Sequence, residues 1–228
     1  MHSDIQLLIL PGLGGDHRMA YPQLALPYHC ITPDYIPIEP NETIEIYAAR
    51  FGDYLAKEHA IGNDRPLFLA GYSFGSAVAQ ELSRTMESSG VILIGGLRSA
   101  SELNPLVRWF GRVIAHRLPL IVYRMAGILL PPTMGRLSLI SNRDITLCQQ
   151  MYLELPRGMF RAGYTLLSEW KGCSVNVPML RIQGNSDHII SNISPKEKMI
   201  RVEGAKHLVG FSNPETVNRE IEQFIESK

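Results

Sequence analysis

Short apolar runs alternate with stretches of helical periodicity along most of this chain. The runs have the length and composition of buried strands. They are residues 6–10, 29–33, 67–70, 91–94, 178–183 and 198–202. The stretches with helical spacing are 42–59 (with Asn41 as the expected cap), 76–87 and 213–227. Because short apolar strands that alternate with helices are typical of a parallel sheet covered on both faces, the pattern predicts an α/β fold with a mainly parallel sheet of about six strands.

Residues 97–176 interrupt this alternation. The segment shows no strand pattern and is rich in arginine and aromatic residues, and the alternation resumes at residue 177. We therefore expect one α/β core made of residues 1–96 and 177–228, with residues 97–176 as a helical insertion that packs as a cap over the strand ends. Its apolar stretch 118–130 fits an acyl-binding lid or simply the core of the cap. At 13 residues and with Arg124 inside it, this stretch is too short and too charged to span a bilayer.

Composition narrows the class of protein. The chain has 228 residues, 45% of them hydrophobic, which is enough for one sizeable core. Lys and Arg (22) balance Asp and Glu (22), which argues against disorder and against a nucleic-acid partner. Cys30, Cys148 and Cys173 are widely spaced, so they indicate neither a zinc site nor a disulfide framework. The first residues lack the basic region of a signal peptide, and we expect a soluble cytoplasmic protein.

A serine lies between two glycines where a predicted strand meets a predicted helix. The segment reads Gly71-Tyr72-Ser73-Phe74-Gly75. In so tight a turn the glycines relieve crowding, and the serine hydroxyl is left exposed at the mouth of the helix. A glycine-rich turn can also bind phosphate, but neither the G-x-G-x-x-G nor the G-x-x-x-x-G-K-[ST] spacing is present. We predict that Ser73 is a nucleophile.

A serine nucleophile needs a base, and the base needs an orienting acid. In open α/β sheets the reacting groups lie beyond the carboxyl ends of the strands. His207 follows the last predicted strand after a glycine turn, and Asp187 follows the strand at 178–183 in the same way. We predict His207 as the base and Asp187 as the acid. His188 is the alternative base and Glu102 the alternative acid.

An oxyanion hole is the third requirement of acyl transfer. The backbone N–H of Phe74, at the start of the predicted helix, offers one donor. The glycine-rich turn at residues 11–15 (PGLGG) follows the first strand and offers the second, which we assign to the N–H of Leu13. An ordinary tight turn without a catalytic role is the alternative for this loop.

The order of these motifs resembles the α/β-hydrolase family over essentially the whole chain. PGLGG follows the first strand, GYSFG forms the elbow, GNSD follows a later strand, and GAKH lies near the C-terminus. The resemblance implies the nucleophile–acid–base order Ser73, Asp187, His207, with Leu13 and Phe74 as oxyanion donors and the insertion as the family's cap. It implies no metal and no organic cofactor.

The chain departs from the family pattern in four places. The family's first two strands are missing, and Pro11-Gly12 stands where His-Gly often opens the oxyanion loop. Ser76 stands where a second glycine usually follows the elbow. Only 20 residues separate Asp187 from His207, too few for the usual helix between the last two strands.

The motifs favour a serine hydrolase that cleaves a carboxylic ester or a thioester, with a small carboxylesterase first. The positive charge of the insertion bears on the substrate, because residues 98 to 161 contain nine arginines, no lysine and three acids. Arg108, Arg112 and His116 recur at helical spacing, and we take Arg98, Arg108 and Arg112 as candidate substrate-binding residues for an acidic acyl carrier, a coenzyme thioester or an anionic membrane surface. A solvated face balanced by acids elsewhere explains the charge equally well. The alternatives within ester chemistry are acyl-carrier or coenzyme thioesterases and carrier-protein methyl esterases. The family resemblance implies three further alternatives: lyases with the same triad, peroxidases with the same triad, and ligand receptors with little turnover.

Overall fold

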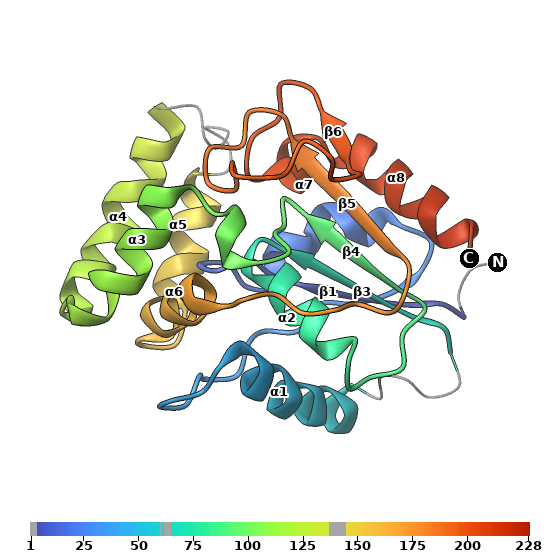
Figure 1. Cartoon of the computed structure of the whole chain (residues 1–228), viewed down its shortest axis with the longest axis horizontal. Coiled ribbons are helices and arrows are strands. Elements are labelled where there is room, and N and C mark those ends of the chain that lie inside the picture. Colours follow the sequence, from blue (N-terminus) through green and yellow to red (C-terminus); the bar gives the residue numbers. More distant parts are fainter. Residues whose placement is uncertain (1–3, 60, 62–64, 137–144) are drawn as a thin grey trace.

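A parallel sheet forms the centre of the computed structural model, which describes residues 4–59, 61, 65–136 and 145–228 (Figure 1). Its strands are β1 (Gln6–Leu10), β2 (His29–Ile31), β3 (Leu67–Tyr72), β4 (Gly90–Ile94), β5 (Met179–Gly184) and β6 (Ile200–Val202). They pair in the order β2-β1-β3-β4-β5-β6, and every pairing is parallel. The predicted fold class is confirmed, and β1, which precedes PGLGG, is the first strand among the described residues.

The helices of the core flank this sheet, and further helices lie between β4 and β5. They are α1 (Ile44–Glu58), α2 (Phe74–Leu82), α3 (Pro105–Val113), α4 (Leu120–Arg136), α5 (Ile145–Glu154), α6 (Met159–Glu169), α7 (Val209–Ser212) and α8 (Pro214–Glu226). Short 3-10 helices are η1 (His17–Ala25), η2 (Ala100–Glu102) and η3 (Ala115–Arg117). The prediction of Asn41 as a helix cap is wrong. Thr43 is the N-cap of α1, with its hydroxyl 3.4 Å from the N–H of Ile46, while Asn41 occupies a left-handed turn position (φ 64°) before it.

Successive side chains of a strand point to opposite sides of the sheet, and both faces of this sheet are buried. On one side Leu8, Leu69 and Leu93 pack in the same cluster as the apolar faces of α1 and α2. On the other side Ile9 and Ile92 pack with residues of α8 and η1. Figure 1 shows the two layers, with α1 and α2 on one side of the sheet and α7 and α8 on the other. Both faces of the sheet are therefore covered by helices.

Helices α3 to α6 lie beyond those strand ends (Figure 1). They belong to the segment 97–176, of which residues 137–144 are outside the described part of the chain. At its start, the N–H of Leu97 donates to the Ser76 hydroxyl at 3.0 Å. At its end, the indole of Trp170 donates to the buried carboxylate of Glu81 at 2.7 Å. Ser76 and Glu81 both belong to α2, so one core helix holds both ends of the segment.

Candidate active site

Ser73 occupies a strained turn between β3 and α2. Its backbone angles are φ 47° and ψ −112°, a region that L residues rarely adopt and that costs about 1–3 kcal/mol. The flanking glycines make the turn possible by allowing backbones to approach. A Cβ at Gly71 would lie 2.2 Å from the carbonyl group of Gly75, and a Cβ at Gly75 would lie 2.5 Å from the carbonyl oxygen of Pro11. Glycine is therefore required at both positions to hold the serine at the tip.

The structure brings Ser73, His207 and Asp187 together from three separate loops. The hydroxyl of Ser73 lies 3.0 Å from Nε2 of His207, and Nδ1 of His207 lies 2.8 Å from Oδ2 of Asp187. An ionised Asp187 can only accept a hydrogen bond, so Nδ1 carries a proton and, in the neutral imidazole, Nε2 is left as an acceptor for the Ser73 hydroxyl. This is the tautomer that a general base facing Ser73 needs.

Asp187 is held as a carboxylate inside the protein, where its side chain is only 1% exposed. Burial alone would raise the pKa of Asp187, but the charge and hydrogen bond of His207 and the N–H groups of Ile190 and Ile189 outweigh it and bring that pKa below its ordinary value. The two N–H groups donate to Oδ1 at 3.0 and 2.8 Å, and the side-chain amide of Gln183 donates to Oδ2. The carboxylate is thereby fixed in orientation as well as in charge.

The loop that carries His207 sits tightly against the end of β4. Gly95 there has φ 53°, and a Cβ at this position would lie 2.4 Å from the carbonyl oxygen of His207. A larger residue at 95 would push the histidine loop away from Ser73. The imidazole itself is 10% exposed, so it is shielded from water but not sealed off.

The two amides predicted as oxyanion donors belong to the start of α2 and to the loop after β1. Phe74 is the first residue of α2, where N–H groups have no acceptor within the helix. In the loop after β1, the N–H of Gly12 donates to the sulfur of Met19 and that of Gly15 to the carbonyl of Gly12, whereas the N–H of Leu13 has no acceptor among the described residues. A Cβ at Gly12 would lie 3.4 Å from Cβ of Ser73, so the loop is close to the serine. The oxyanion role of both amides remains a prediction.

A cavity of about 600 Å³ opens above Ser73 and His207. Its walls come from the strand-end loops and from α3 to α6, and of the described residues that line it none is Asp, Glu, Lys or Arg. Two of its polar groups are already bonded, because the hydroxyls of Tyr123 and Tyr164 donate to the backbone carbonyls of Ala115 and Val107. The cavity is therefore suited to an apolar ligand.

Sequence reasoning missed two residues that support this arrangement. Gln183 orients Asp187 from the end of β5, and the hydroxyl of Tyr35 donates to the carbonyl of Pro11 at 2.7 Å, holding the loop that contains Leu13. A signal for Gln183 was present, because Arg181 and Gln183 are polar residues at alternate positions of an otherwise apolar strand. Tyr35 lies in an irregular segment and gives no such signal.

The alternative acid and base lie elsewhere. Glu102 binds the guanidinium of Arg181 at 2.7 and 3.0 Å, and Arg181 is only 2% exposed, so this carboxylate is committed to a buried ion pair. His188 is exposed on the loop next to Asp187. In this structure neither one takes part in the hydrogen-bonded chain that ends at Ser73.

The three arginines predicted to bind substrate do not reach the cavity above Ser73. Arg98 pairs with Glu197 at 3.2 Å. Arg108 and Arg112 line a separate pocket of about 430 Å³ beside Trp109. Helical spacing correctly placed Arg108 and Arg112 on one side of a helix, but that side faces away from the cavity.

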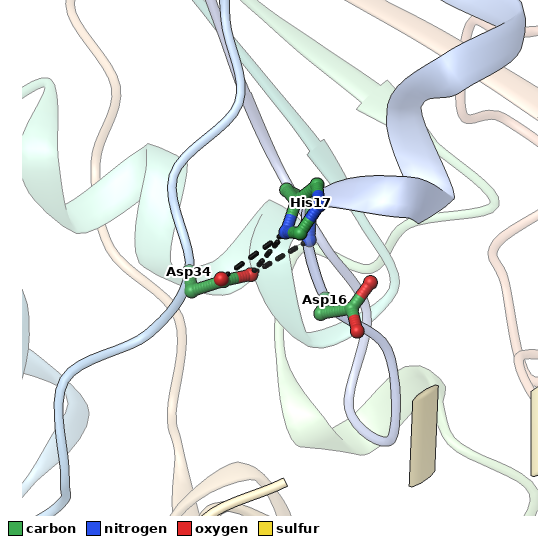
Figure 2. A group of neighbouring side chains, drawn as sticks. All are labelled: Asp16, His17 and Asp34. Atoms are coloured by element: carbon green, nitrogen blue, oxygen red, sulfur yellow. Dashed lines mark hydrogen bonds and ion pairs between the residues drawn. The ribbon is translucent and has the colours of Figure 1, made fainter. Parts of the chain in front are cut away.

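Asp16, His17 and Asp34 form a cluster that resembles a metal site in composition. Figure 2 shows the imidazole and the backbone N–H of His17 directed at Asp34, with Nδ1 3.0 and 3.1 Å from the two carboxylate oxygens. The carboxylate of Asp16 is occupied by the guanidinium of Arg18, which lies within 2.9 Å through Nε, and Asp16 also accepts the N–H of Arg18. These bonds fix the start of η1, and the positive charge of Arg18 opposes a cation, so we assign the cluster a structural role.

Comparison with known proteins agrees with this geometry. A family model described as "Alpha/beta hydrolase family" matches residues 7–220, and the chain therefore belongs to the alpha/beta hydrolase family. No curated protein matches the chain.

Solved structures share the fold at low sequence identity. An esterase from Thermogutta terrifontis is 20% identical, and the match covers 100% of this chain and 91% of that chain with a TM-score of 0.77. A putative non-heme bromoperoxidase, BpoC from Mycobacterium tuberculosis, is 20% identical with 100% and 94% covered and a TM-score of 0.72. MenH from S. aureus is 15% identical with 100% and 95% covered and a TM-score of 0.71. At these identities the likeness establishes the fold and not the reaction.

Proposed function

We propose that the protein is a serine hydrolase that cleaves a carboxylic ester or a thioester through an acyl-enzyme intermediate. The observation that carries the proposal is the unbroken chain of contacts from Ser73 through His207 to Asp187, at 3.0 and 2.8 Å. Membership of the alpha/beta hydrolase family supports it, because a catalytic triad in this chain order is typical of that family.

The mechanism follows from the roles these groups can take. His207 accepts the proton of Ser73 while the serine oxygen attacks the carbonyl carbon, and Asp187 stabilises the resulting imidazolium. The N–H groups of Leu13 and Phe74 donate to the negative oxygen of the tetrahedral intermediate. His207 then gives its proton to the leaving alcohol or thiol. Water, deprotonated by His207, attacks the acyl-serine, and the imidazolium of His207 returns that proton to the Ser73 oxygen as the bond to the acyl group breaks and the acid leaves.

The substrate proposal rests on the cavity. A volume of about 600 Å³ falls in the range of about 300–1,000 Å³ that is usual for small-molecule sites, and its apolar walls favour an uncharged acyl or aryl group. We propose that residues 97–176 act as the cap that forms those walls. An ester with an apolar acyl group is therefore the first candidate, and a thioester of the same acyl group is the second.

A fluorophosphonate probe tests the nucleophile directly. The probe should label Ser73 covalently, as located by mass spectrometry of the digested protein. Ser73→Ala should abolish labelling and lower kcat/KM on p-nitrophenyl esters by at least about 10⁴-fold, whereas Ser191→Ala, at an exposed serine of the loop after β5, should change neither. Labelling of another residue, or hydrolysis by Ser73→Ala at the wild-type rate, would contradict the assignment.

A series of esters with increasing acyl length tests the substrate class. The apolar cavity predicts a clear optimum in kcat/KM along the series and poor turnover of acyl groups that end in a carboxylate. Tight binding of the same compounds with negligible turnover would instead identify a ligand receptor.

A further inference from the structure

The solvent-facing side of α4 is aliphatic. Among the side chains described in this helix, Tyr123 and Gly127 are buried and face the protein. The exposed apolar ones are Leu120 (43%), Ile121 (62%), Val122 (41%), which also lines the cavity above Ser73, Met125 (47%), Ile128 (41%) and Leu129 (58%), and we call these six residues the α4 face. At 100° per residue they span an arc of about 200°. The one charged residue within this arc is Arg124, so the helix has the reverse of the usual surface pattern.

No other described element exposes so many large apolar side chains. Each of the others carries at most two of the exposed large hydrophobic residues. Single exposed apolar residues are normal on a protein surface, but a contiguous group on one helix marks an interaction site.

The part of the chain that contains α4 is mostly positive in charge. Residues 98 to 161 contain nine arginines, no lysine and three acids. Two copies of the chain meeting through this face would bring like charges together, which disfavours a homodimer here. The charge instead favours a partner that is both apolar and anionic.

A small pocket beside the α4 face is rich in cationic donors. It has a volume of about 270 Å³, and its walls include Leu120 and Ile121 of the α4 face together with Arg124, Arg157 and Arg161. We call it the arginine pocket. Its three arginines have no acidic partner among the described residues, and the neighbouring Glu154 is bound to Arg18.

Tyr152 also lines the arginine pocket, but its hydroxyl is buried, has no partner within the described part of the chain and remains protonated, because burial raises the pKa of this phenol. The guanidinium groups are therefore the donors that the pocket offers, and guanidinium groups bind phosphate.

The described helices bear on how the protein could contact a membrane. None of the described helices combines the length and the apolar character needed to cross a bilayer. A helix with an aliphatic outer side flanked by arginines can still lie in the interface of a bilayer.

We propose that the α4 face docks on an anionic phospholipid surface, with its aliphatic side chains among the acyl chains and a lipid phosphate in the arginine pocket. This goes beyond the proposed hydrolysis and does not depend on it. Tyr123, Tyr152 and Phe160 line both the arginine pocket and the cavity above Ser73, so docking sets the lipid headgroups against the outer wall of that cavity.

Co-sedimentation with vesicles tests the proposal. Wild type should bind vesicles of phosphatidylcholine mixed with phosphatidylglycerol at least about tenfold more tightly than pure phosphatidylcholine vesicles, and less tightly as salt rises. Leu129→Ser should weaken binding about tenfold, while Ile46→Ser, at a residue of α1 exposed to a similar degree (55% against 58%), should not change it. Arg157→Gln should weaken binding about fivefold, while Arg201→Gln on β6 should not.

Several outcomes would overturn the proposal. Equal binding to both vesicle types, no binding, or equal loss in the test and control variants would each do so. A dimer of the wild type by analytical ultracentrifugation that Leu129→Ser dissociates would assign the face to a second copy. Displacement from vesicles by millimolar inorganic phosphate, with binding otherwise unaffected by Leu129→Ser, would reduce the site to a free-phosphate pocket.

The proposed hydrolysis can fail separately. Fluorophosphonate labelling of Ser73 in Leu129→Ser and Arg157→Gln reports an intact fold and active site without vesicles. Ser73→Ala should sediment with anionic vesicles as wild type does. Loss of hydrolysis is therefore measured in Ser73→Ala, and loss of vesicle binding in Leu129→Ser and Arg157→Gln.

Discussion

Helices α8 and α4 each pack one side against the protein, and their outer sides differ completely. α8 buries Val217, Ile221 and Ile225 and presents charged and amide side chains, such as Glu215 and Arg219, to solvent. α4 also buries one side, but its outer side is the aliphatic α4 face. Because a helix that contacts only water gains nothing from exposed aliphatic residues, the comparison supports the proposal that α4 has a partner outside the chain, whereas the outer side of α8 is suited to water.

Arginines of the core and arginines near the α4 face also differ in their surroundings. In the core, Arg181 is 2% exposed, and its two terminal nitrogens donate to the carboxylate of Glu102. Around the α4 face, Arg117 and Arg124 are exposed and have no acidic partner among the described residues. Core arginine serves the fold, whereas arginine near α4 is available to a ligand.

The largest expected difference between the two regions is in activity, when Asp187 of the candidate active site is changed and the α4 face is left intact. Asp187→Asn should lower kcat/KM by about 10²–10⁴-fold, because a neutral amide no longer stabilises the imidazolium of His207. Kinetics on a p-nitrophenyl ester measure this loss. Binding to anionic vesicles should be unchanged, and a parallel loss of vesicle binding would show that the two regions are not independent.

The next effect separates the two kinds of arginine. Arg181→Met should lower the free energy of unfolding by about 3–5 kcal/mol, because it leaves the Glu102 carboxylate partly buried without its partner. Arg117→Met, at an exposed position, should change it by no more than about 0.5 kcal/mol. Urea unfolding measures both, and similar losses in the two variants would remove the distinction.

The smallest effect concerns the junction of the two regions. Ser76→Gly restores the glycine usual in the family but leaves the N–H of Leu97 without its side-chain acceptor and adds a glycine to α2. It should cost about 1–3 kcal/mol in unfolding free energy. Retention of full stability would show that the hydroxyl does not help to anchor residues 97–176.

The strands and helices of the core could be predicted from the sequence because each gives a local pattern of apolar residues, and because a parallel sheet allows few ways of connecting them. Short apolar strands alternating with helices leave few topologies, and parallel strands bring Ser73, Asp187 and His207 to the same edge of the sheet. The proximity of these three side chains could therefore be expected from their positions after three different strands.

The environment of residues 97–176 could not be predicted in the same way. The apolar stretch 118–130 was compatible with a lid or with a buried cap core, because apolar composition does not say which side of a helix meets the protein. Helical spacing likewise grouped Arg108 and Arg112 but could not tell that their pocket lies apart from Ser73. Arg124, Arg157 and Arg161 come together only through the packing of α4 against α6 and the turn before it.

The attachment of residues 97–176 to α2 has a consequence for how such a protein can diversify. Leu97 and Trp170 are two of the points where this segment is attached, and both attachments are to the helix that starts beside Ser73. Neither of these hydrogen bonds nor the ion pair between Glu102 and Arg181 involves a side chain of α4, so the outer residues of α4 can change while the reacting groups stay supported by the sheet. Under the proposals above, preference for a surface can in this way change separately from the chemistry of Ser73, His207 and Asp187.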